Sequence, residues 1–158
     1  MRPATLGDAP ALFDVHQASV RALCAGEYSA AHLAVWFDGR SPAMYGPALA
    51  AGRIWLAERD GRVLGFVGFA PGEVTLLFVH PQAAGVGLGK RLLAIGLARA
   101  STGIDAPITV VATLNSRSFY AAQGFTAVGT QVFERGQPAV RFPVVTMLRR
   151  PVAEQGTG

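Results

Sequence analysis

The chain is poor in the residues on which several protein classes depend. It has one cysteine in 158 residues, Cys24, which excludes a disulfide framework and any zinc site built from several cysteines. A lone cysteine here is more typical of a buried helix residue than of a nucleophile. The three histidines lack metal-ligand spacing, so we predict no metal. There is no run of about 18 apolar residues and no apolar signal-type stretch in the first residues. We therefore expect a cytoplasmic protein with no membrane partner.

Charged residues are also scarce, at 15% of the chain, and positive charge prevails with a formal net charge of +4. A basic chain can bind nucleic acid when its arginines and lysines form a stripe. Here the arginines are scattered singly or in pairs, and Lys90 is the single lysine. We therefore expect no nucleic-acid partner, although a mild positive field suits an anionic ligand.

Apolar residues make up 51% of the chain, enough for the core of one ordinary domain. We predict a single domain over residues 1–150 and a flexible tail over 151–158. Periodicity and turn residues predict strands at 2–5, 54–59, 63–70, 74–79, 108–113, 126–134 and 139–148. The same signals predict helices. In this prediction, Asp8 caps the first, Ser29 caps the second over 30–37, and the third begins at Ser41-Pro42 and reaches 51. A further helix follows the glycines and reaches 100, and Asn115/Ser116 caps the last. The fold class is mixed α/β, with a mostly antiparallel central sheet, one parallel pair, and helices on both faces.

The clearest chemical signal is three glycines at alternate positions, Gly85, Gly87 and Gly89, between an apolar strand and a helix. Because glycine has no Cβ, a ligand can come close to the backbone there. Backbone N–H groups and the positive end of the helix attract phosphate oxygens, and Lys90 adds a full charge. The sequence predicts an anion-binding loop, although the same glycines would also let a helix pack closely on its strand.

Two common nucleotide-binding patterns do not fit this loop. A Walker loop requires a glycine where Ala84 stands and a hydroxyl where Arg91 stands. A dinucleotide fingerprint requires a glycine at Lys90 or Leu92. The remaining interpretation is a loop that holds a pyrophosphate without magnesium.

Two motifs resemble the GCN5-related N-acetyltransferase (GNAT) family. The stretch from Leu77-Phe-Val-His-Pro through the glycines to Lys-Arg-Leu-Leu is similar to the family's acetyl-CoA-binding motif, Q/R-x-x-G-x-G/A. Gly87 and Gly89 match its glycines, whereas Ala84 occupies the Gln/Arg position; Gln82, Gly85 and Gly87 satisfy the same expression two residues earlier. Asn115-Ser-Arg-Ser-Phe-Tyr-Ala-Ala-Gln-Gly-Phe resembles a shortened form of the family's second motif, N-x-x-(A/S)-x-x-F-Y-x-x-x-G-F. The resemblance is strong over residues 52–125 and rests elsewhere on element order.

The resemblance implies an acyl-CoA N-acyltransferase-like fold and direct transfer of acetyl from acetyl-CoA to a primary amine of a small molecule or peptide. It implies that the fourth strand separates from the fifth, so that the pantetheine arm lies between them like an added strand. The residues it assigns to the cofactor are Phe78 and Val79 in the strand, Ala84, Gly85, Val86, Gly87, Leu88, Gly89 and Lys90 in the loop, and Asn115 and Ser118 in the second motif. It also implies that the first helices and the last hairpin line the acceptor pocket.

The reaction needs groups that handle charge and protons. An N–H at the end of the fourth strand, for which Val79 is the candidate, would stabilise the oxyanion of the attacked thioester. Tyr120 would protonate the departing thiolate; the alternative is a core tyrosine whose hydroxyl is already bonded. Glu73 would accept the proton of the amine, although a solvated strand-end glutamate or proton transfer to water are alternatives. Relatives often carry a further acid where this chain has Thr75.

Three interpretations remain open at this point. The first is the N-acetyltransferase, and the second is a catalytically inactive CoA-binding module, which the departures at Ala84 and Thr75 would suit. The third is a basic interaction protein whose glycine loop serves packing alone. The acceptor segment offers aromatics and the acids Glu27 and Asp38, but it identifies no acceptor, and the sequence leaves a homodimer open.

Overall fold

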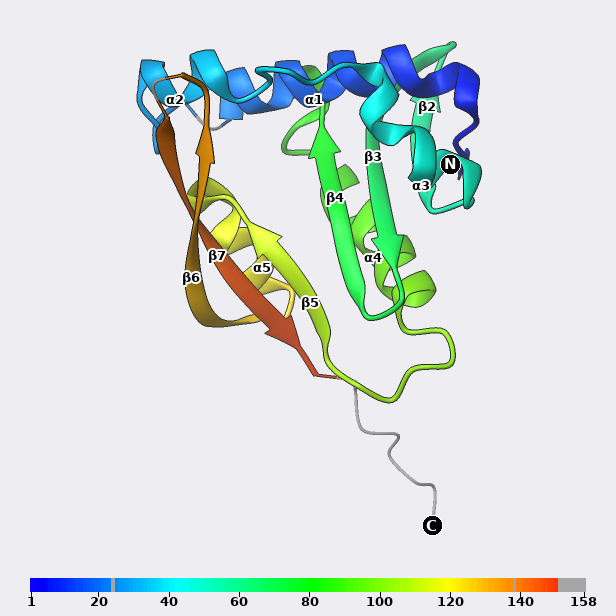
Figure 1. Cartoon of the computed structure of the whole chain (residues 1–158). Helices are drawn as coiled ribbons and strands as arrows, with labels where there is room; N and C mark the ends of the chain where they lie inside the picture. Colours follow the sequence, from blue (N-terminus) through cyan, green and yellow to red (C-terminus); the bar gives the residue numbers. More distant parts are fainter. Residues whose placement is uncertain (24, 138, 151–158) are drawn as a thin grey trace.

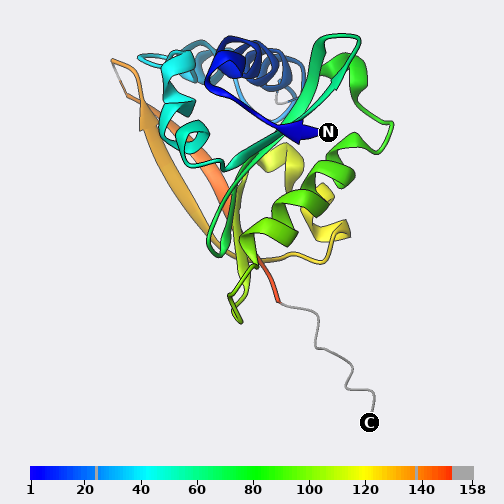
Figure 2. The same cartoon turned by 90° about the vertical axis from the view of Figure 1, so that its right-hand side faces the viewer.

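The computed structural model of the chain describes residues 1–23, 25–137 and 139–150. The expectations for Cys24 and for a flexible tail over 151–158 lie outside these residues. The described part forms one seven-stranded sheet in the order β1-β2-β3-β4-β5-β7-β6, in which only β4 and β5 pair in parallel. Figure 2 shows α4 and α5 on one side of the sheet and α1 to α3 on the other. The predicted fold class is confirmed. Within this part of the chain, every helix is too short or too polar to cross a membrane.

The elements follow the predicted order. The strands are β1 (Arg2–Pro3), β2 (Ile54–Arg59), β3 (Arg62–Ala70), β4 (Glu73–Val79), β5 (Ile108–Ala112), β6 (Thr126–Arg135) and β7 (Val140–Arg149). The α-helices are α1 (Ala9–Leu23), α2 (Ala30–Val35), α3 (Gly46–Ala50), α4 (Leu88–Ala100) and α5 (Arg117–Ala122). The 3-10 turns are η1 (Leu6–Asp8), η2 (Pro42–Tyr45), η3 (Pro81–Ala83) and η4 (Leu114–Ser116).

Two predicted helix starts are wrong. Asp8 does not cap α1: its carboxylate accepts the backbone N–H of Thr5 at 2.7 Å and pairs with Arg2 at 2.9 Å, so it closes a capping box on η1. Asn115 and Ser116 give α5 no side-chain cap, because the side-chain oxygens of both bond the Thr113 hydroxyl at 2.7 Å.

The helix predicted over residues 42–51 is also interrupted. It divides into η2 and α3, which starts at Gly46 with Pro47 in its first turn. Proline lacks the N–H that would continue a helix from the preceding turn, and it is tolerated in a first turn. The chain therefore begins a new helix there. Ser29, by contrast, caps α2 as predicted, with its hydroxyl accepting the His32 N–H at 3.3 Å.

Each face of the sheet carries its own core. Leu92 and Leu93 of α4 pack on Val67 and Val74, and Leu12 and Val15 of α1 pack on the opposite face. The α4 side requires a glycine at one point, because a Cβ on Gly96 would lie 2.6 Å from Val67 Cγ2. These two layers hold the central strands β3 and β4 in place.

The sheet opens between β4 and β5. These strands pair only at Glu73↔Thr109 and Val74↔Val110, and Figure 1 shows them diverging from there. The register of β4 against β3 shifts at Thr75, which is an extra residue between the Gly68↔Leu76 and Phe69↔Val74 pairs. A Cβ on Gly68 would lie 2.7 Å from Thr75 Oγ1, so the bulge depends on this glycine. A bulge bends its strand, and beyond it β4 leaves β5, which continues along β7.

Candidate active site

Two residues on the free edge of β4 turn their backbone N–H and C=O groups toward the opening. His80 N–H donates to Leu64 O at 2.7 Å, toward β3, and Phe78 is paired with Phe66. Residues along an antiparallel strand alternate between those bonded to the neighbour and those facing away. The N–H and C=O groups of Leu77 and Val79 therefore face the opening, whereas those of Phe78 face β3. Of the two backbone positions that the sequence predicts, Val79 has this orientation, and Leu77 takes the place of Phe78.

The glycine loop between η3 and α4 presents unpaired backbone donors. Gly85 and Gly87 have φ of +82° and +79°, a region that favours glycine. Among the described residues, the N–H groups of 85–90 donate to no protein acceptor. The N–H of Ala84, in contrast, is bonded to Pro81 O at 3.2 Å. The loop thus offers a continuous run of donors that starts one residue later than the sequence predicts.

The start of α4 adds the helix dipole to these donors. Gly87 is its N-cap, and the first bond that closes the helix runs from Arg91 N–H to Gly87 O at 3.2 Å. The preceding N–H groups, including those of Gly89 and Lys90, have no acceptor within the helix. Lys90 is exposed beside them and forms no ion pair within the described chain. The backbone donors, the helix N-terminus and the unpaired cation thus lie together at the start of α4.

These groups line a cleft of about 590 Å³, called here the loop cleft. All the predicted cofactor residues line it except Val86, whose side chain is exposed, and Ser118, on the outer side of α5. The residues that sequence reasoning missed are Ser19, Leu77, Ala83, Thr113, Ser116 and Phe119. Ser19 lies on α1, far away in the sequence, and no motif marks it.

Tyr120 lies at the inner end of the loop cleft. It is 5% exposed and packs edge-on against Phe119 and Phe125. Within the described chain its hydroxyl has no hydrogen-bond partner, and burial raises the pKa of this hydroxyl well above its ordinary value. The side chain borders both the loop cleft and a narrow passage between β4 and β5. It is a protonated hydroxyl at the border of these two spaces, and its role as an acid stays a prediction.

The narrow passage, called here the strand gap, has a volume of about 50 Å³ and lies between β4 and β5. It shares Leu77, Phe78 and Tyr120 with the loop cleft. It also shares residues with a second cavity of about 360 Å³, among them Thr75 and Val111. The lining of the second cavity is His16, Trp36, Arg40, Met44, Glu73, Thr75, Leu76, Phe78, Val111, Thr113, Phe133, Arg135, Phe142 and Val144. A molecule in the strand gap would touch both spaces.

The second cavity includes some of the residues expected near an acceptor and not others. Glu73 lines it from the start of β4, and Trp36 lines it from the segment after α2. Glu27 and Asp38 are exposed and do not line it. Tyr28 is a core residue, since its hydroxyl donates to Pro143 O at 2.8 Å and accepts the Leu114 N–H at 3.0 Å. The cavity thus has one carboxylate from the predicted set.

His16 on α1 is a part of this cavity that the sequence did not single out. It is 2% exposed, its ring lies 3.8 Å from that of Phe78, and its Nδ1 is 2.7 Å from the Tyr45 hydroxyl. Burial and then the charge of Arg40 lower the pKa of His16 to about 3. The imidazole is therefore neutral at ordinary pH.

His80, in contrast, is a structural cap, because its Nδ1 accepts the Gln82 N–H at 3.2 Å. Among the described residues, no group of His, Cys, Asp and Glu is arranged to hold a metal.

Comparison with known proteins bears on this arrangement. Residues 24–145 match the acetyltransferase (GNAT) domain, which is more than half of the chain. The chain belongs to the GNAT family. A mycothiol acetyltransferase of Thermomonospora curvata is 38% identical over 93 residues, which are 54% of this chain and 31% of that protein. A second, from Streptomyces bingchenggensis, is 37% identical over 90 residues. The chain thus spans about a third of the length of these curated relatives.

Solved GNAT structures share the fold over most of the chain. A GCN5-related N-acetyltransferase from Rhodopseudomonas palustris has a TM-score of 0.86 at 24% identity, covering 95% of this chain and 94% of its own. The PaiA N-acetyltransferase from Thermoplasma acidophilum, solved with coenzyme A, has a TM-score of 0.74 at 19% identity, covering 95% and 97%. The resemblance drawn from the two motifs is confirmed, because the family match identifies a GNAT acetyltransferase domain.

Proposed function

We propose that this GNAT domain transfers the acetyl group of acetyl-CoA to an amine of a small molecule or peptide. The observation that carries the proposal is the run of unpaired N–H groups at residues 85–90, next to a strand pair that opens at Thr75. Phosphate oxygens need such donors, and a pantetheine arm carries amides that need a strand edge. The two features lie on one continuous cleft.

The edge groups of β4 would hold the pantetheine arm and the thioester. The C=O and N–H of Val79 would pair with a pantetheine amide, as an added strand does. The Leu77 N–H, nearer the strand gap, would then donate to the thioester oxygen. That oxygen gains negative charge when the amine attacks, and a fixed donor there lowers the barrier. The sequence prediction assigned this task to Val79; the N–H groups of both residues face the opening, and Leu77, unlike Val79, lines the strand gap.

Proton transfers complete the reaction. The amine nitrogen forms a bond to the carbonyl carbon, the C–S bond breaks, and the thiolate takes the proton of the Tyr120 hydroxyl. Glu73, on the second cavity, would take a proton from the amine directly or through water. The second cavity would thus hold the acceptor and the loop cleft the CoA, with the strand gap as the meeting point.

The experiment is a calorimetric titration with acetyl-CoA followed by an assay of thiol release with a panel of amines, in which mass spectrometry detects the acetylated product. Gly87→Ala should weaken acetyl-CoA binding about 10-fold. Holding an alanine at φ of +79° costs about 1–2 kcal/mol of conformational free energy, which binding must supply to keep the loop in this conformation. Val86→Ala, which removes only exposed side-chain atoms beside it, should change the affinity less than about 2-fold. Absence of binding by the unaltered protein would contradict the proposal.

The second candidate is a CoA-binding module without catalysis, which the alanine at position 84 and the threonine at position 75 motivate. Such a module would also bind acetyl-CoA, but it would not transfer the acetyl group. Binding of acetyl-CoA without thiol release for any amine of the panel would favour it. A Tyr120 hydroxyl that is unpaired among the described residues favours the enzyme.

A further inference from the structure

Two arginines meet at the second cavity. Arg40 reaches it from the segment after α2, and Arg135 from the end of β6. Within residues 1–23, 25–137 and 139–150, the ion pairs are those of Arg2 with Asp8 and Glu58, both at 2.9 Å. Neither cavity arginine therefore has a carboxylate partner in the described protein.

The charge of Arg135 acts on Arg40. Arg40 is half-buried, and its burial and then the charge of Arg135 lower the pKa of its guanidinium. Arg135 uses one N–H for Glu134 O at 3.1 Å and lies 5.8 Å from the Phe133 ring centre, which leaves further donors free. Two like charges without a counter-ion destabilise the folded chain, and an anion between them would remove that cost.

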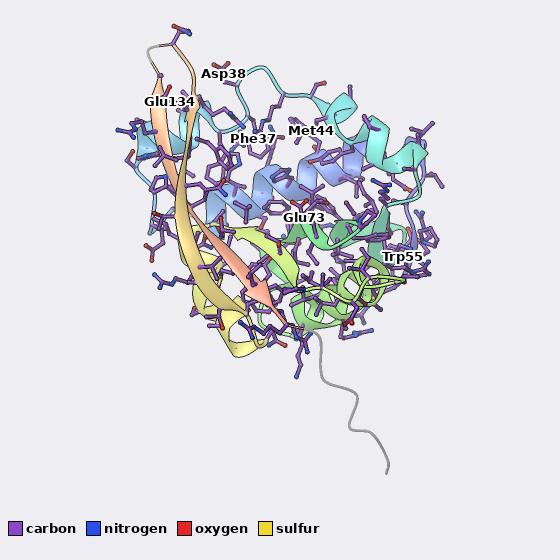
Figure 3. All side chains as sticks on the ribbon, turned by 60° about the horizontal axis from the view of Figure 1, so that its bottom comes forward. Phe37, Asp38, Met44, Trp55, Glu73 and Glu134 are labelled. Carbon is purple, nitrogen blue, oxygen red and sulfur yellow. The ribbon has the colours of Figure 1, made fainter. Side chains whose placement is uncertain are left out.

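The surrounding groups do not neutralise this charge. Glu73 is the single carboxylate on the described lining of the cavity. Figure 3 shows Asp38 and Glu134 toward the outer end of the β6–β7 hairpin, whereas Glu73 lies nearer the centre. Asp38 and Glu134 are exposed, and neither lines the cavity. His16 is neutral, as shown above, so the lining carries two positive charges and one negative charge.

We propose that the acceptor is an amine that also carries an anionic group, a carboxylate or a phosphate, and that Arg40 and Arg135 bind this group. Glu73, beside the strand opening, would face the amine, so the charges of acceptor and cavity are complementary. The wall between them is apolar and consists of Trp36, Met44, Phe133, Phe142 and Val144. The acceptor therefore has an apolar portion between its two charged ends. This inference rests on the proposed function for the amine and on the unpaired arginines for the anion.

The first test measures binding without turnover. N-acetyl-L-methionine and N-acetyl-L-methioninamide differ in one carboxylate, and both are titrated calorimetrically with and without CoA. N-acetylethanolamine phosphate and N-acetylethanolamine form the matched pair for a phosphate. We expect at least one anionic probe to bind 10- to 100-fold more tightly than its neutral partner, the range of a charge-assisted hydrogen bond. Equal affinities within both pairs, or no binding of either anion at millimolar concentration, overturn the inference.

Substitutions assign the effect to the arginines. Arg40→Gln and Arg135→Gln should each remove most of the preference for the anion and leave the neutral probe within about 3-fold. Arg40→Lys and Arg135→Lys keep the positive charge and should retain part of the preference for the anion. Arg141→Gln, on the exposed part of the same hairpin and outside the cavity, makes the same change in net charge and should keep the preference. A loss of preference in Arg141→Gln equal to that in Arg135→Gln overturns the inference.

Turnover separates this inference from the proposed function. Acetylation of L-methionine is compared with that of L-methioninamide, whose amine is the less basic and so is the more reactive at neutral pH. Equal turnover of both, together with equal affinities within both probe pairs, overturns the anion site and leaves the acetyltransferase standing. Anion-selective binding without turnover of any amine supports the anion site and contradicts the acetyltransferase.

Discussion

The buried imidazole of His16 predicts how the stability of the fold depends on pH. Its pKa is about 3 in the folded protein, against 6.5 for an ordinary histidine. The unfolded chain therefore binds a proton between these two pH values that the folded chain does not bind. Stability is fully retained above pH 6.5 and falls as the pH drops toward 3. Each unit of pH in this window costs about 1.4 kcal/mol, so pH 4.5 costs about 2.7 kcal/mol relative to pH 7.5.

The assay is urea unfolding at pH 7.5, 5.5 and 4.5, with His16→Gln as the test variant and His80→Gln as the control. His16→Gln should lose most of the pH dependence, because glutamine does not titrate and can still bond the Tyr45 hydroxyl. His80→Gln should keep it. Asp8, whose pKa Arg2 lowers to about 2, loses its contribution only below about pH 3.8, outside the measured range. An undiminished slope in His16→Gln, or an NMR titration that finds the pKa of His16 near 6.5, would contradict a buried, neutral imidazole.

Three further changes test other parts of the account. Gly96→Ala should lower the free energy of unfolding by about 1–3 kcal/mol in urea, because its Cβ would meet Val67 Cγ2 at 2.6 Å; an unchanged stability would contradict the packing of α4 on β3. Tyr120→Phe should reduce kcat about 10- to 100-fold with the acetyl-CoA Kd within about 2-fold, and equal loss of both would exclude the acid role. Glu73→Gln should reduce kcat/KM for the amine about 10-fold at unchanged acetyl-CoA affinity; no reduction would mean that water accepts the proton.

The local signals of the sequence predict most of the fold and much of the lining of the loop cleft. Turn glycines such as Gly61 and Gly72, both at positive φ, mark the hairpins at their true positions. Gly85 and Gly87 likewise mark the loop of unpaired N–H groups, because a backbone at positive φ favours glycine at identifiable positions. The wrong helix starts at Asp8 and Asn115 have one cause. A side chain that can cap a helix can also bond a closer partner, here Arg2 or Thr113, and local pattern does not decide between them.

The residues that sequence reasoning missed come together only through the fold. Arg40 and Arg135 are 95 residues apart, and both read as ordinary surface arginines next to turns. His16 lies on an amphipathic helix, where its spacing does not distinguish it from core residues. The exchange of Phe78 for Leu77 at the edge of β4 depends on a bulge at Thr75, and a one-residue shift reverses every backbone group of a strand. The orientation of these backbone groups follows from strand register, which cannot be read from the sequence.

The most direct test of the central claim is a two-dimensional ¹H–¹⁵N NMR titration of the labelled protein with coenzyme A. We expect the amide signals of residues 85–90, Leu77 and Val79 to shift most and those of the outer strand β6 to stay in place. The Ala84 amide, already bonded to Pro81 O, should shift less than its neighbour Gly85. Saturable binding in which the amides of 85–90 do not move would contradict the account, whatever the activity of the protein.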